Sequence, residues 1–163
     1  MFREMRRHGQ QLTGEACEQI LARGSAGVLA VSGDNGYPYA VPLSYVYHNN
    51  AIFFHGAASG HKLDAIRQNG KASFCAIDRD EVIPEKLTTA YRSVIAFGTA
   101  YILEDEAEIR AAAQMLGQKY SPGMDELINQ EIETYMRHMA VVRLDIEHMT
   151  GKIGKELLQE NQE

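Results

Sequence analysis

The apolar residues in the first half of the chain occur in short runs that predict β-strands. The runs span 27–32, 37–48, 51–55 and 72–78, and they are rich in β-branched and aromatic residues. Turn signals separate the first three runs, at Gly33-Asp34-Asn35-Gly36 and at Asn49-Asn50. These three strands are therefore expected to form an antiparallel meander. The second strand contains two prolines, which cannot donate ladder hydrogen bonds, so we expect it at an edge, a bulge or a barrel corner.

Helical spacing marks four other segments. The first is a helix that Thr13 can cap and Gly24 can end. Its apolar side consists of Ala16, Cys17, Ile20 and Leu21. Ser59 is expected to cap a second helix over 61–68. The last two helices are predicted at about 105–119 and 123–138, separated by Ser121-Pro122-Gly123.

Two later strands complete the pattern, one over 91–103 with Gly98 at a bend and one over 140–146. Residues 79–90 are expected to form a polar connection. The ends are expected to be a polar arm over about 1–12 and a frayed polar tail over about 156–163. Long, mostly antiparallel strands with helices set aside predict one α+β domain over 1–163, built on a barrel.

Composition narrows the class of protein. The chain has 163 residues and a formal net charge of -6, which argues against a nucleic-acid binder. No apolar run approaches the length of a membrane span, and the charged N-terminus does not read as a secretory signal. We therefore expect a cytoplasmic protein that binds neither nucleic acid nor membrane. Cys17 and Cys75 lie outside any CxxC pattern and are read as core residues in a reducing compartment, although a disulfide stays open.

The segment from His55 to Lys62 (HGAASGHK) is the first candidate for chemistry. A strand ends, small residues follow, and a helix begins, so backbone N–H groups and a positive dipole end are available to an anion. Lys62 lies in the first helical turn, where a cation opposes the dipole unless an anion is near. The segment is thus either a phosphate cradle or a plain turn with a solvated lysine.

Two further segments carry candidates with open alternatives. Arg92 enters an otherwise apolar strand, where its guanidinium could bind a phosphate or could form an ion pair with an acidic residue. Pro42 interrupts the ladder next to Ser44, where backbone groups could meet a flat ring or could simply protect an edge strand. The scattered histidines show no ligand spacing, so no metal site is predicted. The chain lacks the Walker A, GxGxxG and GxSxG motifs.

The order of these segments resembles the pyridoxamine-phosphate-oxidase-like split-barrel flavoproteins, and within them the nitroimidazole-resistance (Nim) branch. The resemblance covers roughly residues 10–155. It is carried by GVLAVSGDNGYPYAVPLSYVY, AIFFHGAASGHKLDAIRQNGKASFCAID, YRSVIAFGTAYILED and a late strand followed by TGK. It implies a six-stranded split barrel with peripheral helices, a homodimer, and FMN held in a groove between the subunits.

The resemblance also implies roles for particular residues. The flavin ring would be lined by Val41, Pro42, Leu43 and Ser44. The ribityl chain and phosphate would follow His55, Gly56 and Ala57, with Lys62 neutralising the phosphate. The site would be completed by Tyr91, Arg92 and Ser93. His55 also matches the histidine implicated in nitroimidazole reduction, where it could donate a proton or serve only as a cofactor contact.

The implied function is an FMN-dependent reductase of small oxidised acceptors such as nitroaromatics, with NAD(P)H as a candidate donor. One alternative is a non-catalytic protein that binds or stores FMN or haem. Another is a pyridoxamine-phosphate oxidase, although the arginine-rich C-terminal substrate signature of those enzymes is missing. A small-ligand barrel without any cofactor stays open as well.

Overall fold

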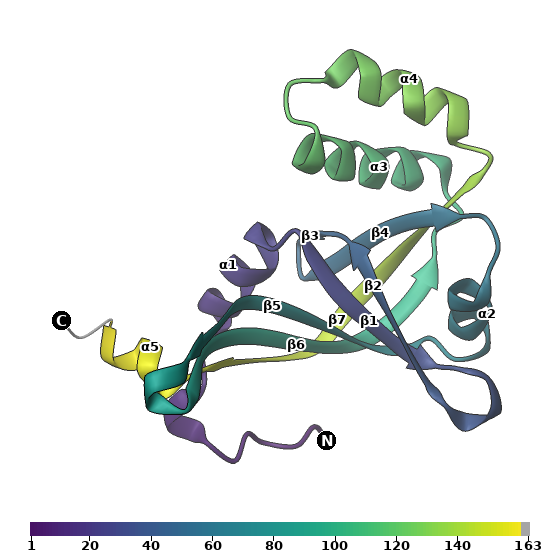
Figure 1. Ribbon diagram of the computed structural model, residues 1–163. Helices are drawn as coiled ribbons and strands as arrows, with labels where there is room; N and C mark the ends of the chain where they lie inside the picture. The colour runs from purple at the N-terminus through teal and green to yellow at the C-terminus, as the bar shows by residue number, and fades with distance from the viewer. Residues whose placement is uncertain (161–163) are drawn as a thin grey trace.

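The computed structural model describes residues 1–160 of the chain. It contains one antiparallel sheet of seven strands, in the order β2-β1-β5-β6-β7-β4-β3. The strands are β1 (Ala26–Ser32), β2 (Pro38–Ser44), β3 (Val46–His48), β4 (Ala51–Ala57), β5 (Lys71–Ile83), β6 (Thr88–Ile102) and β7 (Met139–Ile153). The helices are α1 (Gly14–Arg23), α2 (His61–Gln68), α3 (Glu106–Tyr120), α4 (Asp125–Tyr135) and α5 (Lys155–Glu160). The α+β class predicted from the sequence is confirmed (Figure 1).

The sheet curls into an open, split barrel because its two edge strands are consecutive in the chain. β2 and β3 lie at opposite ends of the strand order, yet only Tyr45 separates them. The single strand predicted over 37–48 is therefore two strands, and the sheet has seven strands where the resemblance implied six. Tyr45 is completely buried at this seam, and its ring meets Phe74 edge-on at 4.7 Å between centroids.

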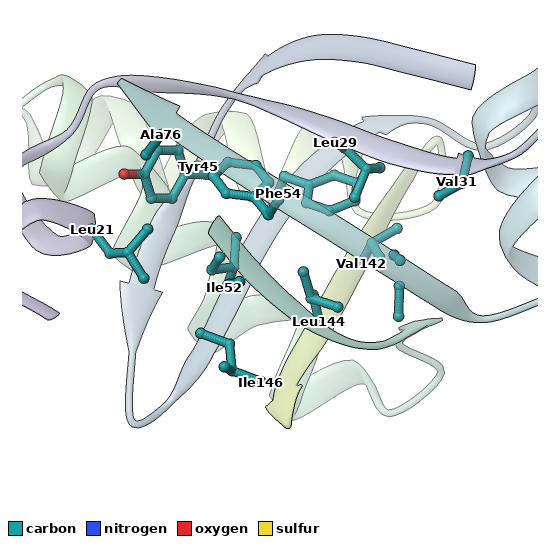
Figure 2. Close-up of a cluster of buried hydrophobic side chains, with 14 of the residues drawn as sticks. Leu21, Leu29, Val31, Tyr45, Ile52, Phe54, Ala76, Val142, Leu144 and Ile146 are labelled. Carbon is teal, nitrogen blue, oxygen red and sulfur yellow. The ribbon is translucent and has the colours of Figure 1, made fainter. Parts of the chain in front are cut away.

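The barrel interior is filled by alternate residues of the strands. Figure 2 shows Phe54 and Leu29 beside Tyr45, with Val142 and Leu144 below them and Leu21 of α1 below Tyr45. These side chains are fully or almost fully buried. A smaller cluster lies outside the barrel wall, between the opposite face of β4 and helix α3. The odd-numbered residues of β4 therefore face α3, while its even-numbered residues face the interior.

The helices lie around the barrel rather than across it (Figure 1). Thr13 caps α1 by accepting a hydrogen bond from the Ala16 N–H, as predicted, and Gly24 follows the last helical residue. Asp105 caps α3 in the same way. The predicted Ser59 cap of α2 is wrong, since the helix begins after Gly60, whose φ is +135° and whose side chain offers no oxygen. α4 packs mainly on α3 and stands farther from the sheet.

Four segments are more ordered than the sequence pattern predicted. Residues 79–90 continue β5 and β6 into a hairpin that turns at Pro84–Lys86, because strand pairing uses backbone groups that polar side chains leave free. β7 continues past 146 to Ile153. The arm contains a buried Gln10, whose side chain donates a hydrogen bond to the Ile153 carbonyl at 2.9 Å. The tail forms α5 up to Glu160, and its last three residues, 161–163, lie outside the described part.

Two other expectations concern the chain as a whole. Cys17 and Cys75 are both free thiols, as their spacing indicated. Within residues 1–160, no helix is both long and apolar enough to cross a lipid bilayer.

Candidate functional site

The corner where β4 gives way to α2 has an open strand edge. β4 pairs with β7 along its whole length, from Ala51 opposite Asp145 to Ala57 opposite Met139. On its other side, β3 pairs with β4 only as far as Phe53. The edge from Phe54 to Ala57 therefore carries no neighbouring strand, and backbone N–H and C=O groups there are available to a ligand.

Lys62 projects from the first turn of α2 to this corner. Its Nζ lies 3.3 Å from the position that a Cβ of Gly56 would occupy, and 5.5 Å from the centroid of the Phe54 ring. Gly56 thus lets the ammonium approach the backbone of β4. Among the described residues, no carboxylate pairs with Lys62, although it is half-buried. A half-buried cation beside bare backbone groups is a favourable place for an anion.

The N-terminus of α2 adds to the positive character of the corner. No side chain caps its first turn; the Leu63 and Asp64 N–H groups donate to the Gly60 carbonyl, which leaves those of His61 and Lys62 for a ligand. His61 holds this end of the helix against β2, because its ring stacks on Tyr39 with centroids 4.2 Å apart. Its Nε2 also lies 3.5 Å from Asp34. The N-terminal end of α2 is therefore fixed relative to β2.

His55 lies on the opposite face of β4 from the Lys62 ammonium, since successive strand residues alternate. Part of its ring remains exposed to solvent. Loss of water around the rest lowers its pKa below the ordinary 6.5, and the positive charge of Lys62 lowers it further. His55 is consequently a neutral imidazole at pH 7, with one N–H donor and one acceptor nitrogen.

A cavity of about 650 Å³ opens beside His55, outside the barrel wall. Four of the residues predicted for the cofactor site line it, namely Ser44, His55, Gly56 and Ala57. Its other walls come from α3 and α4 and from the start of β7. The structure thus brings the end of β2 and the end of β4 together around one space.

The four predicted ring contacts on β2 divide between its two faces. Val41 and Leu43 pack against the core, while Pro42 and Ser44 face outward and are exposed. Pro42 lies opposite Val28 in the pairing with β1. Only Pro42 and Ser44 can therefore present side chains to a ligand outside the barrel.

The predicted contacts at Tyr91, Arg92 and Ser93 lie far from this corner in the same chain. Arg92 is opposite Ile153 on β7, whereas Ile102, ten residues further along β6, is opposite Val142 next to the partner of His55. Ten strand residues span roughly 30 Å. Within one protomer, these three residues are not brought to the His55 corner.

Arg92 instead has a partner of its own. Its Nε donates to the Asp78 carboxylate at 2.5 Å, and Arg23 at the end of α1 donates to the other oxygen at 2.7 Å. Burial raises the pKa of Asp78, but hydrogen bonds from the two guanidinium groups outweigh it, and the pKa is lowered overall. The ion-pair interpretation of Arg92 fits this geometry.

Sequence reasoning missed the contribution of the two late helices. Their apolar residues were read as core, yet Leu116, Tyr120, Ile132 and Tyr135 line the cavity. His138 also lines it, although it carried no ligand spacing in the sequence. The available signal was the pair of aromatic residues that end the helices, Tyr120 and Tyr135. Within residues 1–160, no group of three or more potential metal ligands is found.

Comparisons with known proteins place this geometry in a family. The family model described as pyridoxamine 5'-phosphate oxidase matches residues 13–153. A solved structure of a conserved hypothetical protein from Mycobacterium tuberculosis is similar, with a TM-score of 0.81, 18% identity, and coverage of 94% of this chain and 92% of that one. None of the curated proteins compared with the chain matches it.

Two other solved structures share the fold. A candidate 5-nitroimidazole antibiotic resistance protein from Bacteroides thetaiotaomicron has a TM-score of 0.72 at 20% identity, covering 88% of this chain and 86% of that one. The FAD and haem binding protein from Mycobacterium smegmatis has a TM-score of 0.75 at 20% identity, covering 90% and 74%. The family model extends from the cap of α1 to the end of β7, and the protein therefore belongs to the pyridoxamine 5'-phosphate oxidase family.

Proposed function

We propose that the protein is a cytoplasmic, FMN-dependent reductase of small oxidised acceptors such as nitroaromatics. The observation that carries the proposal is Lys62, whose ammonium lies against Gly56 at an open strand edge and pairs with no carboxylate within residues 1–160. The positive charge of this corner and its free backbone groups fit a phosphate monoester.

Five of the predicted site residues have a physical role in this proposal. Lys62 and the first N–H groups of α2 hold the phosphate, and the open edge of His55, Gly56 and Ala57 follows the ribityl chain. Ser44 reaches the ring from β2. His55 donates one N–H to a bound acceptor or cofactor. When bound, FMN would supply the redox chemistry, taking two electrons from a donor such as NAD(P)H and passing them to the acceptor.

Proteins of the same fold support a flavin over an unrelated ligand. The Mycobacterium smegmatis structure is described as an FAD and haem binding protein, and the Azotobacter vinelandii one as a flavocytochrome. We favour FMN over FAD because the corner provides one cation, Lys62, for one phosphate. A diphosphate would bring additional negative charge, whereas Lys62 is the lysine that the structure places against this strand edge.

We also propose a homodimer, because an apolar face of the sheet is left in water. Ile77 of β5 and Ile95 of β6 face outward and are 63% and 40% exposed. A second copy packed on this face would cover both residues. It could also carry Tyr91 and Ser93 of one protomer to the His55 corner of the other, which would reunite the predicted cofactor site.

A non-catalytic protein that holds FMN or haem is the second candidate. It is favoured by the fold shared with the flavin and haem proteins and by the two histidines, His55 and His138, that line one largely apolar cavity. The third candidate, a pyridoxamine-phosphate oxidase, would need cations for a substrate phosphate in addition to Lys62.

Spectra of the purified protein and cofactor titrations test the proposal. We expect flavin absorption bands, and FMN affinity reduced about ten-fold or more in Lys62→Met, since a charge-assisted contact is lost while the stem on Phe54 is kept. Lys86→Met, in the exposed β5–β6 turn, is the control and should bind FMN normally. Equal affinity of both variants would refute the phosphate site.

Further measurements separate the alternatives. A Soret band in place of flavin bands would favour the haem candidate. Bound FMN without consumption of NADH or NADPH in the presence of a nitroaromatic would favour a carrier. Ile95→Glu should yield a monomer in sedimentation velocity and weaken FMN binding. A monomer with unchanged FMN affinity would contradict the shared site.

A further inference from the structure

The cavity beside His55 is covered by α3 and α4, and none of the residues proposed to hold the flavin lies on these two helices. α4 contributes Ile128, Ile132 and Tyr135, and α3 contributes Leu116 and Tyr120. Leu116 and Ile132 are 4% exposed, so the inner wall is firmly packed. Gly117 lets the two helices meet closely, since a Cβ at this position would lie 2.6 Å from Ile128. The space of about 650 Å³ lies within the range of small-molecule sites.

The rim of this cavity leaves large apolar groups in water. Leu127 and Tyr135 of α4 both line it, and they are 51% and 52% exposed. Aromatic and aliphatic side chains at the mouth of a concave site gain stability when a ligand with an apolar surface covers them. The rim therefore favours a flat ring over a polar chain.

The cavity differs in charge from the corner at Lys62. Among the described residues that line it there is no lysine or arginine, and the ionised group is the Glu131 carboxylate. His55 is neutral at pH 7 because of burial and of the charge of Lys62, which keeps its pKa low. Lys62 itself lies on the other face of β4. An anionic ligand in the cavity would lose water without gaining a cation, next to a carboxylate of like charge.

We propose that this cavity is the acceptor pocket, that it takes an uncharged aromatic ring beneath α4, and that it discriminates against aromatic anions, including phosphorylated ones. The inference rests on the proposed function, because the ring would lie next to a flavin held at the Lys62 corner. His55 and Gly56 line the cavity and also belong to the strand edge beside Lys62, so they would bring acceptor and cofactor into contact. Tyr135 and Leu127 are the specificity-determining residues at its mouth.

A matched pair of probes tests the charge preference. Binding of 4-nitrobenzamide and 4-nitrobenzoate, which differ in charge but little in size, is measured by saturation-transfer NMR with and without FMN. We expect the amide to bind at least about ten-fold more tightly than the carboxylate, because an unpaired anion must be desolvated. Equal binding of the two probes would overturn the proposal.

Variants on α4 locate the pocket. Leu127→Lys places a cation at the rim and is expected to reduce the preference for the amide at least about five-fold, since it supplies the missing partner for an anion. Met124→Lys is the control, because Met124 is 53% exposed at the start of the same helix and does not line the cavity. Identical effects of the two variants would place the probe elsewhere and refute the pocket.

The two proposals fail in different ways. FMN titration of the wild-type chain and of Leu127→Lys reports on the cofactor alone, and both should bind FMN equally. If FMN does not bind, the proposed reductase is wrong whatever the probes do. If FMN binds and the probe preference does not respond to Leu127→Lys, the acceptor pocket is wrong while the flavin site stands.

Discussion

The ammonium of Lys119 lies over the ring of Tyr45, 4.3 Å from its centroid, and donates a hydrogen bond to the Tyr45 carbonyl at 2.8 Å. It donates a second bond to the Gly24 carbonyl at 2.6 Å. The next residue, Tyr120, accepts a hydrogen bond from the Tyr45 N–H through its Oη at 2.8 Å. The end of α3 thus supplies hydrogen-bond partners for both the N–H and the C=O of Tyr45, the residue that separates β2 from β3.

These hydrogen bonds to Gly24 and Tyr45 predict that Lys119 stabilises the fold. Lys119→Met keeps the stem but removes two charge-assisted hydrogen bonds to carbonyls, and should lower the free energy of unfolding by about 2–3 kcal/mol. Urea unfolding followed by circular dichroism measures the change. Gln118→Met, an exposed neighbour on the same helix, should change it little. Equal stability of the two variants would show that these hydrogen bonds contribute nothing.

At the β-bulge at Gly98 the neighbouring strand leaves no room for a side chain, so we expect substitution of Gly98 to destabilise the fold. A Cβ at Gly98 would collide with the Asp145 carbonyl oxygen on β7, where the strand register shifts. Gly98→Ala should therefore cost about 3 kcal/mol or more, as overpacking against a backbone atom cannot be relieved by rotation. Gly14→Ala, in open space in α1, should be neutral or slightly stabilising. Thermal unfolding of both variants is the measurement, and a normal midpoint for Gly98→Ala would contradict the collision.

The ion pairs of Asp78 predict a loss of stability in acid. Because its pKa is lowered in the folded protein, the stabilising contribution is complete above pH 3.8 and is lost as pH falls through the folded-state value. Asp78→Asn should cost about 2 kcal/mol at pH 7 and make unfolding less dependent on pH in the acid range. Asp80→Asn, an exposed carboxylate two residues further on, is the control. Matching acid profiles of wild type and Asp78→Asn would contradict the assignment.

The position of His55 near Lys62 predicts that binding of the cofactor phosphate favours protonation of His55. The folded-state pKa of His55 lies below 6.5, so its neutral form is favoured and its effect is a loss of stability as pH falls below that value. A phosphate dianion at Lys62 would offset the ammonium and raise the pKa of His55. NMR titration of the His55 ring with and without FMN measures this change.

Lys62→Met provides the matched test for this linkage. Without the ammonium, the pKa of His55 should already be higher in the cofactor-free protein. FMN should then shift it much less than in the wild type. If the titration of His55 is identical in all four samples, Lys62 and the phosphate do not act on His55.

The features of the Lys62 corner could be predicted from sequence because they are local. Small residues before a helix and a lysine in its first turn are seven residues apart at most, and their geometry follows from the strand-to-helix transition. The surroundings of Arg92 could not be found in this way. Its partner Asp78 is shared with Arg23, which is 55 residues from Asp78 in the chain. Only the packing of α1 on the sheet brings the three charges together.

The cavity wall formed by α3 and α4 shows a different limit of prediction from sequence. The spacing of apolar residues in α3 and α4 predicts helices with one apolar side, but such a side looks the same whether it covers a core or an open space. The hairpin over 79–90 was missed because its charged side chains concealed strands that backbone pairing holds. Tyr45 could not be identified as a strand break because it lies among residues of equal β propensity.

The pairing of β4 with β7 has a consequence for synthesis. β4 emerges from the ribosome early, but its long neighbour begins only at Met139, after both late helices. Until that last strand is translated, the segment from Ile52 to Ala57 has no pairing strand except the short β3. Its apolar side chains stay unpacked in the nascent chain during that time. The Lys62 corner is therefore among the last parts of the protein to form, and under the proposed function an unfinished chain could not hold the cofactor.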